Sequence, residues 1–283
     1  MAKLKVAELF YSIQGEGRYM GVPSVFLRVF GCNFKCEGFG MPKGELSDER
    51  NVIALKVDDI RDYNSLPLVS TGCDSYASWD PRFKHLSPVL STDSISDTIM
   101  DMLPHKRWED EHLVITGGEP LLGWQRAYPE LLEHPKMQAL AELTFETNGT
   151  QKLDPAFYDY LRDEWVLERG YDALTFSVSP KLSVSGEKWE EAICPDVVAE
   201  YNSIGYTYLK FVVASQDDID EAQQAVDEYR KAGFTGPVYV MPVGGVESVY
   251  NMNSRNVAEF AIKKGWRYSD RLQVPLFKNE WGT

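Results

Sequence analysis

The segment Gly31-Cys32-Asn33-Phe34-Lys35-Cys36 holds two of the four cysteines, and a third, Cys73, lies farther along the chain. The first two cysteines directly follow Ser24–Phe30, a run rich in apolar and aromatic residues that predicts a buried strand. A cysteine pair on the loop after such a strand, with a third cysteine available, is typical of a metal or iron–sulfur site. Free cysteines can also be small buried hydrophobic residues. That explanation suits Cys194, but polar neighbours surround the cysteine pair.

Three thiolates favour an iron–sulfur cluster, because a structural zinc ion usually has four closed ligands. Three cysteines on a 4Fe–4S cluster leave one iron open for a substrate or cofactor. The spacing C-x3-C is similar to the first half of the radical S-adenosylmethionine (SAM) signature, C-x3-C-x2-C. Cys73-Asp74-Ser75-Tyr76 resembles the continuation after the third cysteine of that signature. We therefore interpret Glu37–Gly72 as a 36-residue insertion and Cys73 as the third ligand.

Composition limits the classes of function. The chain has 283 residues and no low-complexity linker, which favours a single domain over residues 1–283 with the insertion at 37–72. The formal net charge of −14 argues against direct nucleic-acid binding and favours a small-molecule substrate. No apolar run is long enough to span a membrane, and the N-terminus lacks the order of a signal peptide. We therefore expect a cytoplasmic protein with no membrane partner, whose reduced thiols can bind iron.

Apolar strands alternate with helices along most of the chain. The expected strands are Lys3–Phe10, Ser24–Phe30, His112–Ile115, Ala141–Glu146, Ala173–Val178, Tyr206–Val213, Pro237–Met241 and Leu272–Pro275. The expected helices are Ser91–Leu103, Leu131–Leu140, Pro155–Asp163, Asp217–Ala232, Asn253–Lys264 and one that begins near Pro195. This alternation predicts an α/β fold with a parallel sheet, either open or closed into a barrel.

Polar segments follow several of these strands, where ligands gather in parallel α/β folds. In Thr116-Gly117-Gly118-Glu119-Pro120, two glycines allow close backbone approach and the glutamate can accept a hydrogen bond from an ammonium group. The glycines of Gln14-Gly15-Glu16-Gly17 indicate a polar loop whose backbone approaches a ligand, although a plain hairpin turn is an alternative. Arg28 lies inside an apolar run and needs an anionic partner from the protein or from a ligand.

Taken together, these motifs resemble the 7-carboxy-7-deazaguanine synthases, the radical SAM enzymes of queuosine and 7-deazapurine biosynthesis. The matching segments are YSIQGEG at 11–17, GCN at 31–33, CDS at 73–75, ITGGEP at 115–120, FETNGT at 145–150 and SVSPK at 177–181. The resemblance implies a partial (β/α)6 barrel of the radical SAM type, often found as a homodimer. It also implies conversion of 6-carboxy-5,6,7,8-tetrahydropterin to 7-carboxy-7-deazaguanine with loss of ammonia. The implied cofactors are a 4Fe–4S cluster, SAM and Mg²⁺, with an electron donor such as flavodoxin.

The resemblance also implies roles for individual residues, with no catalytic residue beyond the cofactor chemistry. The implied cluster ligands are Cys32, Cys36 and Cys73. Ser75 stands where the family has a Mg²⁺-binding threonine, and its hydroxyl is still a hard oxygen donor. The implied SAM-binding residues are Gly118, Glu119, Ser179, Pro180 and Lys181. The implied pterin contacts are Ile13, Gln14, Gly15, Thr116 and Arg28, the last of which would pair with the pterin carboxylate.

Two other functions remain possible at this point. A glycyl-radical activase would use the same cluster but would need a large protein partner, and such enzymes lack the N-terminal YSIQGEG loop. A binding module could instead use Cys194 as the fourth ligand of a closed zinc site. The insertion could be a surface excursion, a lid over the cluster, or a docking site for a reductase or another protein. We expect it to pack beside the cluster without a catalytic residue of its own, with Val52–Val57, which could form a strand, docked on the barrel.

Overall fold

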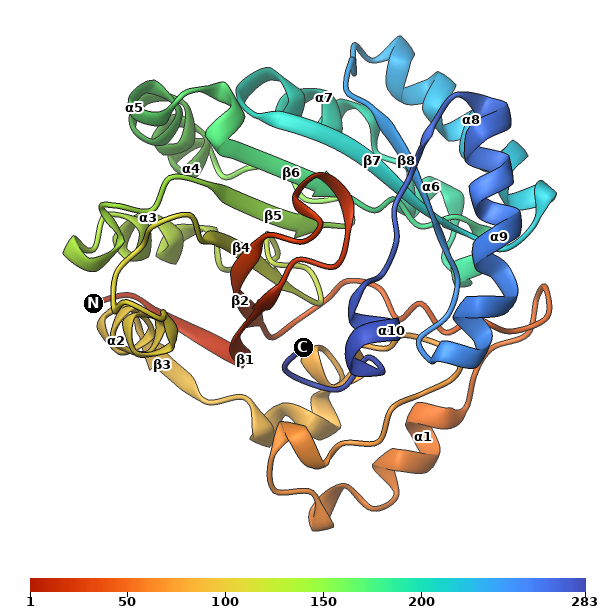
Figure 1. Cartoon of the computed structure of the whole chain (residues 1–283), viewed down its shortest axis with the longest axis horizontal. Coiled ribbons are helices and arrows are strands. Elements are labelled where there is room, and N and C mark those ends of the chain that lie inside the picture. The colour runs from red at the N-terminus through yellow and green to blue at the C-terminus, as the bar shows by residue number, and fades with distance from the viewer.

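A nine-stranded sheet runs through the computed structural model, which describes residues Met1 to Thr283 (Figure 1). In spatial order its strands are β3 (Val89–Ser91), β1 (Lys3–Ile13), β2 (Pro23–Val29), β4 (His112–Gly117), β5 (Leu143–Thr147), β6 (Leu174–Val178), β7 (Tyr206–Val213), β8 (Val238–Pro242) and β9 (Arg267–Tyr268). The strands from β2 to β9 pair in parallel, whereas β1 and β3 are antiparallel additions at one edge. The end strands β3 and β9 do not pair with each other, so the sheet is open. The predicted α/β fold with a parallel sheet is confirmed.

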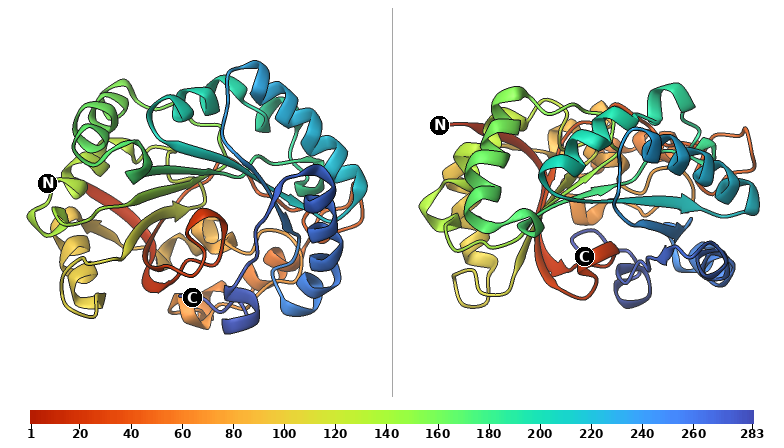
Figure 2. Two further views of the ribbon diagram at one scale, coloured as in Figure 1. Left: turned by 45° about the horizontal axis from the view of Figure 1, so that its top comes forward. Right: turned by 90° about the horizontal axis from the view of Figure 1, so that it is seen from above.

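Helices cover the outer side of the curved sheet (Figure 2). They are α2 (Thr92–Met102), α3 (Tyr128–Leu132), α4 (Pro155–Tyr160), α5 (Leu167–Arg169), α7 (Pro195–Ile204), α8 (Gln216–Lys231) and α9 (Glu247–Lys264), and a π-helical turn at Leu161–Val166 joins α4 to α5. A short helix, α6 (Trp189–Ala192), follows β6. Every residue of β6 and of β8 is buried, as expected for parallel strands covered on both faces. None of the helices is both long and apolar enough to cross a membrane.

The insertion and the C-terminal segment lie on the open side of the sheet, between β1 and α9 (Figure 1). The insertion contains one helix, α1 (Glu49–Ala54), and the C-terminal segment contains α10 (Gln273–Phe277). A second hydrophobic cluster, separate from the main core, joins the insertion to the chain that follows Cys73. Its buried members are Ala7, Ile60, Tyr63, Leu66, Val69, Tyr76, Ala77, Trp79 and Phe83.

The two ends of the insertion are held together by hydrogen bonds. The Gly72 N–H donates to the Phe39 carbonyl at 2.7 Å, and the Ser47 N–H donates to the Glu37 carbonyl at 2.8 Å. Arg50 forms ion pairs with Glu37 at the start of the insertion and with Asp80 beyond its end. These contacts bring Cys73 back beside Cys36, despite the long stretch of chain between them.

Several expected elements are wrong or displaced. The run Val52–Val57 is not a strand, because its apolar residues repeat with helical spacing: Ile53, Ala54 and Val57 contact the second cluster. Val52 and Leu55 are 57% and 84% exposed, so only one side of the run packs against this cluster, which includes Ala7 of β1.

The proline residues explain two further differences. Leu272–Pro275 is not a strand but forms the start of α10, and Pro275 could not donate a hydrogen bond to a neighbouring strand. The expected helix Leu131–Leu140 ends at Leu132 because Pro135 follows, and a short 3-10 turn takes its place. Helix α9 begins at Glu247, six residues before the expected start at Asn253.

Candidate active site

One cavity lies at the carboxyl ends of the parallel strands and brings together residues from the whole length of the chain. The predicted site residues that line it are Ile13, Gln14, Gly15, Arg28, Cys32, Cys36, Cys73, Ser75, Thr116, Gly118, Ser179 and Lys181. Glu119 and Pro180 do not line it, and neither does Cys194. Helices and sheet therefore gather nearly all of the residues expected from the motifs into one place. A closed zinc site that includes Cys194 does not fit this arrangement.

The three cavity cysteines are free thiols. Burial raises the pKa of Cys32 to about 12, and it also raises the pKa values of Cys36 and Cys73. Buried thiolates therefore need a positive partner, and an iron–sulfur cluster would supply one. The donor set at this cavity, three cysteine thiols, fits a 4Fe–4S cluster with one open iron.

The loop that carries Cys36 is fixed by a residue that the motifs did not indicate. Glu187 accepts hydrogen bonds from the backbone N–H groups of Lys35 and Cys36 at 2.8 and 2.7 Å. Cys36 has a φ of 51°, a left-handed conformation that is unusual for a residue with a side chain. On the other side, the Trp79 indole N–H donates to the Cys73 sulfur at 3.4 Å. These contacts preorganise the loops around the thiols.

Arg28 has an anionic partner from the protein. Its Nε donates to Glu8 Oε2 at 2.8 Å, and its Nη1 donates to Ser75 Oγ at 3.2 Å. A β-bulge between Val6 and Glu8 sets the register that places Glu8 directly opposite Arg28. The Nη2 atom makes no hydrogen bond within the chain and remains available at the cavity. Ser75, the predicted Mg²⁺ ligand, therefore lies beside the predicted carboxylate-binding group.

Other parts of the chain pack closely on the loop at 14–17. A side chain at Gly15 would place its Cβ 1.9 Å from Gln273 Oε1, and one at Gly17 would lie 2.1 Å from the Tyr208 hydroxyl. Gly17 also has a φ of 67°, a conformation that favours glycine. Gly15 lines the cavity as well, so the predicted approach of its backbone to a ligand stays a prediction.

The cavity is also lined by charged residues that were given no role from the sequence, among them Asp74, Glu146, Lys210 and Arg271. Glu146 accepts from Gln14 Nε2 at 3.1 Å and from Thr116 Oγ1 at 3.0 Å, so it links two predicted pterin contacts. Lys210 interrupts the apolar strand β7 just as Arg28 interrupts β2, and the same reasoning would have identified it.

Glu119 is fully buried behind the cavity wall. Its carboxylate accepts hydrogen bonds from the Thr147 hydroxyl and from the N–H groups of Leu121 and Asn148. Burial raises its pKa to about 7 despite these donors. Glu119 thus joins the loop after β4 to the loop after β5 and does not itself line the cavity.

Known proteins are similar to this chain over nearly its whole length. No family model matches it. The 7-carboxy-7-deazaguanine synthase of Halobacterium salinarum is 30% identical over 297 residues, which cover 98% of this chain and 91% of that protein. The 7-carboxy-7-deazaguanine synthase of Pyrobaculum aerophilum is 27% identical over 280 residues, which cover 99% of this chain and 97% of that protein.

Among solved structures, the crystal structure of QueE from Escherichia coli is similar, with a TM-score of 0.53 and 19% identity. The match covers 94% of this chain and 93% of that one. It confirms the predicted fold class, an α/β partial barrel of the radical SAM type. With the identity to the Halobacterium protein over nearly the full length of both chains, the chain belongs to the 7-carboxy-7-deazaguanine synthase family.

Proposed function

We propose that this protein is a radical SAM lyase that converts 6-carboxy-5,6,7,8-tetrahydropterin to 7-carboxy-7-deazaguanine with loss of ammonia, in 7-deazapurine biosynthesis of the queuosine type. One structural observation is the main support for this proposal. A single cavity joins three free thiols to a polar set suited to a pterin carboxylate, in a chain that belongs to the 7-carboxy-7-deazaguanine synthase family.

The cavity has two functional sides. On one side Cys32, Cys36 and Cys73 would hold the 4Fe–4S cluster, which together with bound SAM supplies the one-electron chemistry that starts the reaction. Gly118 lines the cavity and would present its backbone to SAM. A side chain at this position would clash with the loop that carries Cys32, because its Cβ would lie 2.4 Å from the Gly31 carbonyl oxygen. Lys181 reaches the cavity with only a Ser179 hydroxyl as hydrogen-bond partner, so its ammonium group can pair with the SAM carboxylate.

On the other side, the chain would bind and orient the pterin. Arg28 Nη2 would pair with the pterin carboxylate, while Glu8 keeps the guanidinium in place. Ser75 would bind Mg²⁺ through its hydroxyl, next to that carboxylate. Ile13, Gln14, Gly15 and Thr116 would contact the ring. The residues that surround the cavity would also exclude water from the reacting atoms.

Glu119 and Pro180 would act on SAM indirectly, because they lie behind the cavity lining. We further propose that the protein is a cytoplasmic homodimer that receives electrons from a carrier such as flavodoxin. The family resemblance supports the dimer and the donor, and the need to keep the cavity thiols reduced supports the compartment.

Anaerobic turnover tests the function directly. The reconstituted protein, incubated with SAM, a reductant, Mg²⁺ and the tetrahydropterin, should yield a product with the mass of 7-carboxy-7-deazaguanine, and it should contain iron and acid-labile sulfide. Zinc without sulfide would contradict the proposal. So would a loaded cluster that cleaves SAM but leaves the pterin unchanged, which is the result expected of a glycyl-radical activase.

A further inference from the structure

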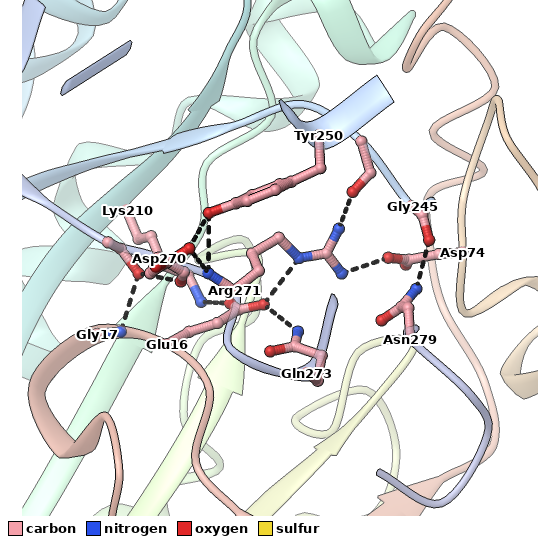
Figure 3. A network of polar contacts seen from close by, with 12 residues as sticks. Glu16, Gly17, Asp74, Lys210, Gly245, Tyr250, Asp270, Arg271, Gln273 and Asn279 are labelled. Carbon is pink, nitrogen blue, oxygen red and sulfur yellow. Dashed lines mark hydrogen bonds and ion pairs between the residues drawn. The ribbon is translucent and has the colours of Figure 1, made fainter. Parts of the chain in front are cut away.

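The segment that follows β9 contributes several residues to the cavity wall, including Arg271 and Gln273. Arg271 lies at the centre of its polar contacts (Figure 3). The guanidinium donates in three directions: Nε to Glu16 Oε1 at 3.2 Å, Nη2 to Asp74 Oδ2 at 2.6 Å, and Nη1 to the Gly244 carbonyl at 2.5 Å. The side chain is 11% exposed, so these contacts are shielded from water.

The partners of Arg271 come from different functional loops. Glu16 directly follows Gln14 and Gly15, which would contact the pterin. Asp74 lies between Cys73 and Ser75, which would bind the cluster and Mg²⁺. Given the proposed function, we propose that Arg271 is a positioning residue that couples the pterin-binding loop at 13–17 to the cluster-binding loop at 72–78. A change at Asp74 would then alter the pterin-binding loop through the Arg271 guanidinium.

The C-terminal segment is shaped to hold the loop at 13–17. The Leu272 N–H donates to the Gly15 carbonyl at 3.0 Å, and the Gly17 N–H donates to Ser269 Oγ at 2.9 Å. Gln273 Nε2 adds a second hydrogen bond to Glu16 Oε1, at 2.9 Å. These contacts leave the loop little freedom to move without the C-terminal segment.

The backbone of Arg271 is held in place by Asp270 and Tyr250. Its backbone N–H donates to Asp270 Oδ1 at 2.8 Å and to the Tyr250 hydroxyl at 3.2 Å, and Tyr250 in turn hydrogen-bonds to Asp270. Glu16 and Asp74 are therefore connected by the side chain of a residue whose backbone is anchored to α9.

The two carboxylates of the network differ in the number of cations with which they pair: Glu16 pairs with Lys210 and Arg271, and Asp74 pairs with Arg271. Burial raises the pKa of Glu16, but Lys210 and Arg271 outweigh it and lower the pKa to about 2. Partial burial raises the pKa of Asp74, but the Arg271 guanidinium has the larger effect, so this pKa also lies below its ordinary value. Lys210 forms an ion pair with Glu16, but it has none with Asp74, whose cationic partner is Arg271. Lys210 is therefore a matched control: it supports one of the two loops, whereas Arg271 supports both.

Arginine is suited to this position because its planar guanidinium offers five N–H donors in fixed directions. A lysine would keep the positive charge but could not reach acceptors on three sides. Arg271→Lys thus removes the bridge while it keeps the charge in the cavity. Asp74→Asn is a milder change that weakens the same bridge from its far end.

Hydrogen–deuterium exchange on the anaerobic, cluster-loaded protein, without SAM or pterin, tests the coupling without turnover. We expect Arg271→Lys to increase exchange about tenfold in both loops, and Lys210→Met to increase it at 13–17 alone. Asp74→Asn should also increase exchange at 13–17, although Asp74 makes no contact with that loop. An unchanged loop at 13–17 in Asp74→Asn, or an equal response of both loops to Lys210→Met, would overturn the proposal even if Arg271→Lys folds poorly.

Steady-state kinetics of the holoenzyme separates positioning from simple loss of stability. Asp74→Asn should raise KM for the tetrahydropterin about fivefold in the parent and should have no further effect in an Arg271→Lys background. The same factor in both backgrounds would show that Arg271 does not transmit the effect. If the protein does not turn over the pterin at all, the proposed function fails, and the exchange data still decide whether the two loops are coupled.

Discussion

At the scale of single residues, the orientation of Arg28 depends on one carboxylate from the neighbouring strand. Glu8 is 9% exposed and lies opposite Arg28 because of the β-bulge in β1. A buried cation that loses its partner is costly, whereas an exposed ion pair contributes little. The pair therefore both stabilises the fold and directs the free side of the guanidinium towards the cavity.

We predict that Glu8→Ala lowers the free energy of unfolding by about 3 kcal/mol, because it leaves the Arg28 charge buried and unpaired. Glu8→Gln should cost less, since the amide oxygen can still accept from Nε. Urea unfolding monitored by circular dichroism measures both. The control is Glu259→Ala, which breaks an exposed pair with Arg255 and should cost less than about 1 kcal/mol. Equal losses in Glu8→Ala and Glu259→Ala would contradict this view of Glu8.

The charge of Glu16 predicts a dependence of stability on pH. Its folded-state pKa of about 2 lies below the ordinary value of 4.5, so the ionised carboxylate favours the folded state. This contribution is complete above about pH 5 and is lost as the pH falls from 4.5 towards 2, at most about 3 kcal/mol. The difference in unfolding free energy between the parent and Glu16→Gln should therefore shrink over this range. A difference that stays constant from pH 6 to pH 3 would show that Lys210 and Arg271 do not lower the pKa of Glu16 in the folded state.

The site residues differ in how far they could be predicted from the sequence. The three cavity cysteines and Thr116 lie in short motifs, and Arg28 interrupts an apolar strand. Both kinds of signal can be read from neighbouring residues in the sequence. Lys210 carries the same local signal as Arg28. Arg271 carries none, because its carboxylate partners lie 197 and 255 positions away in the chain and only the folded sheet brings them together.

At the scale of elements, the insertion returns the chain to the cluster loop at little entropic cost. Closing a longer loop costs only logarithmically more than closing a short one. The buried hydrophobic residues that anchor the insertion are Ile60, Tyr63, Leu66 and Val69. They follow Val52–Val57, the run that was expected to dock. They recur at every third position, which fits neither the alternation of a strand nor the 3.6-residue period of an α-helix, and Tyr63 lies in a 3-10 turn. A search for strand or α-helix periodicity therefore does not identify them.

Arg50 connects the two sides of the insertion, and its loss should weaken the cluster site. It pairs with Glu37 next to Cys36 and with Asp80 beyond Cys73, and its guanidinium lies 4.6 Å from the Trp79 ring centroid. We predict that Arg50→Ala makes the iron–sulfur absorbance bleach in air about fivefold faster or more, because the two cysteine loops can separate.

The matched control for Arg50→Ala is Arg82→Ala. Arg82 also pairs with Asp80, but it makes no contact with Glu37, and its side chain is 38% exposed. Its loss should leave bleaching close to that of the parent. Equal bleaching in Arg50→Ala and the parent would show that the insertion does not hold the cysteines together.

At the scale of the whole molecule, three distant parts of the chain close the open side of the sheet. Trp281 of the C-terminal segment packs edge-on against Tyr63 of the insertion and against Tyr76, with ring centroids 5.3 and 5.6 Å apart. Its indole N–H donates to the Leu66 carbonyl at 3.0 Å. The parallel strands were predictable because each is a local apolar run. This closure was not, because it depends on contacts between segments more than 200 positions apart.

We predict that Trp281→Ala lowers the free energy of unfolding by about 2 kcal/mol, less than the roughly 3–5 kcal/mol of a fully buried tryptophan, because Trp281 is half-buried. The larger effect should be on the cavity, since the insertion and the C-terminal segment would lose their common contact and admit oxygen to the cluster. Bleaching in air should therefore accelerate in Trp281→Ala even at temperatures where the fold is intact. Trp281→Phe is the control: it keeps the ring contacts with Tyr63 and Tyr76 but loses the hydrogen bond to Leu66, and its bleaching should stay near that of the parent. If Trp281→Ala destabilises the protein without faster bleaching, the closure supports the fold but does not protect the cluster.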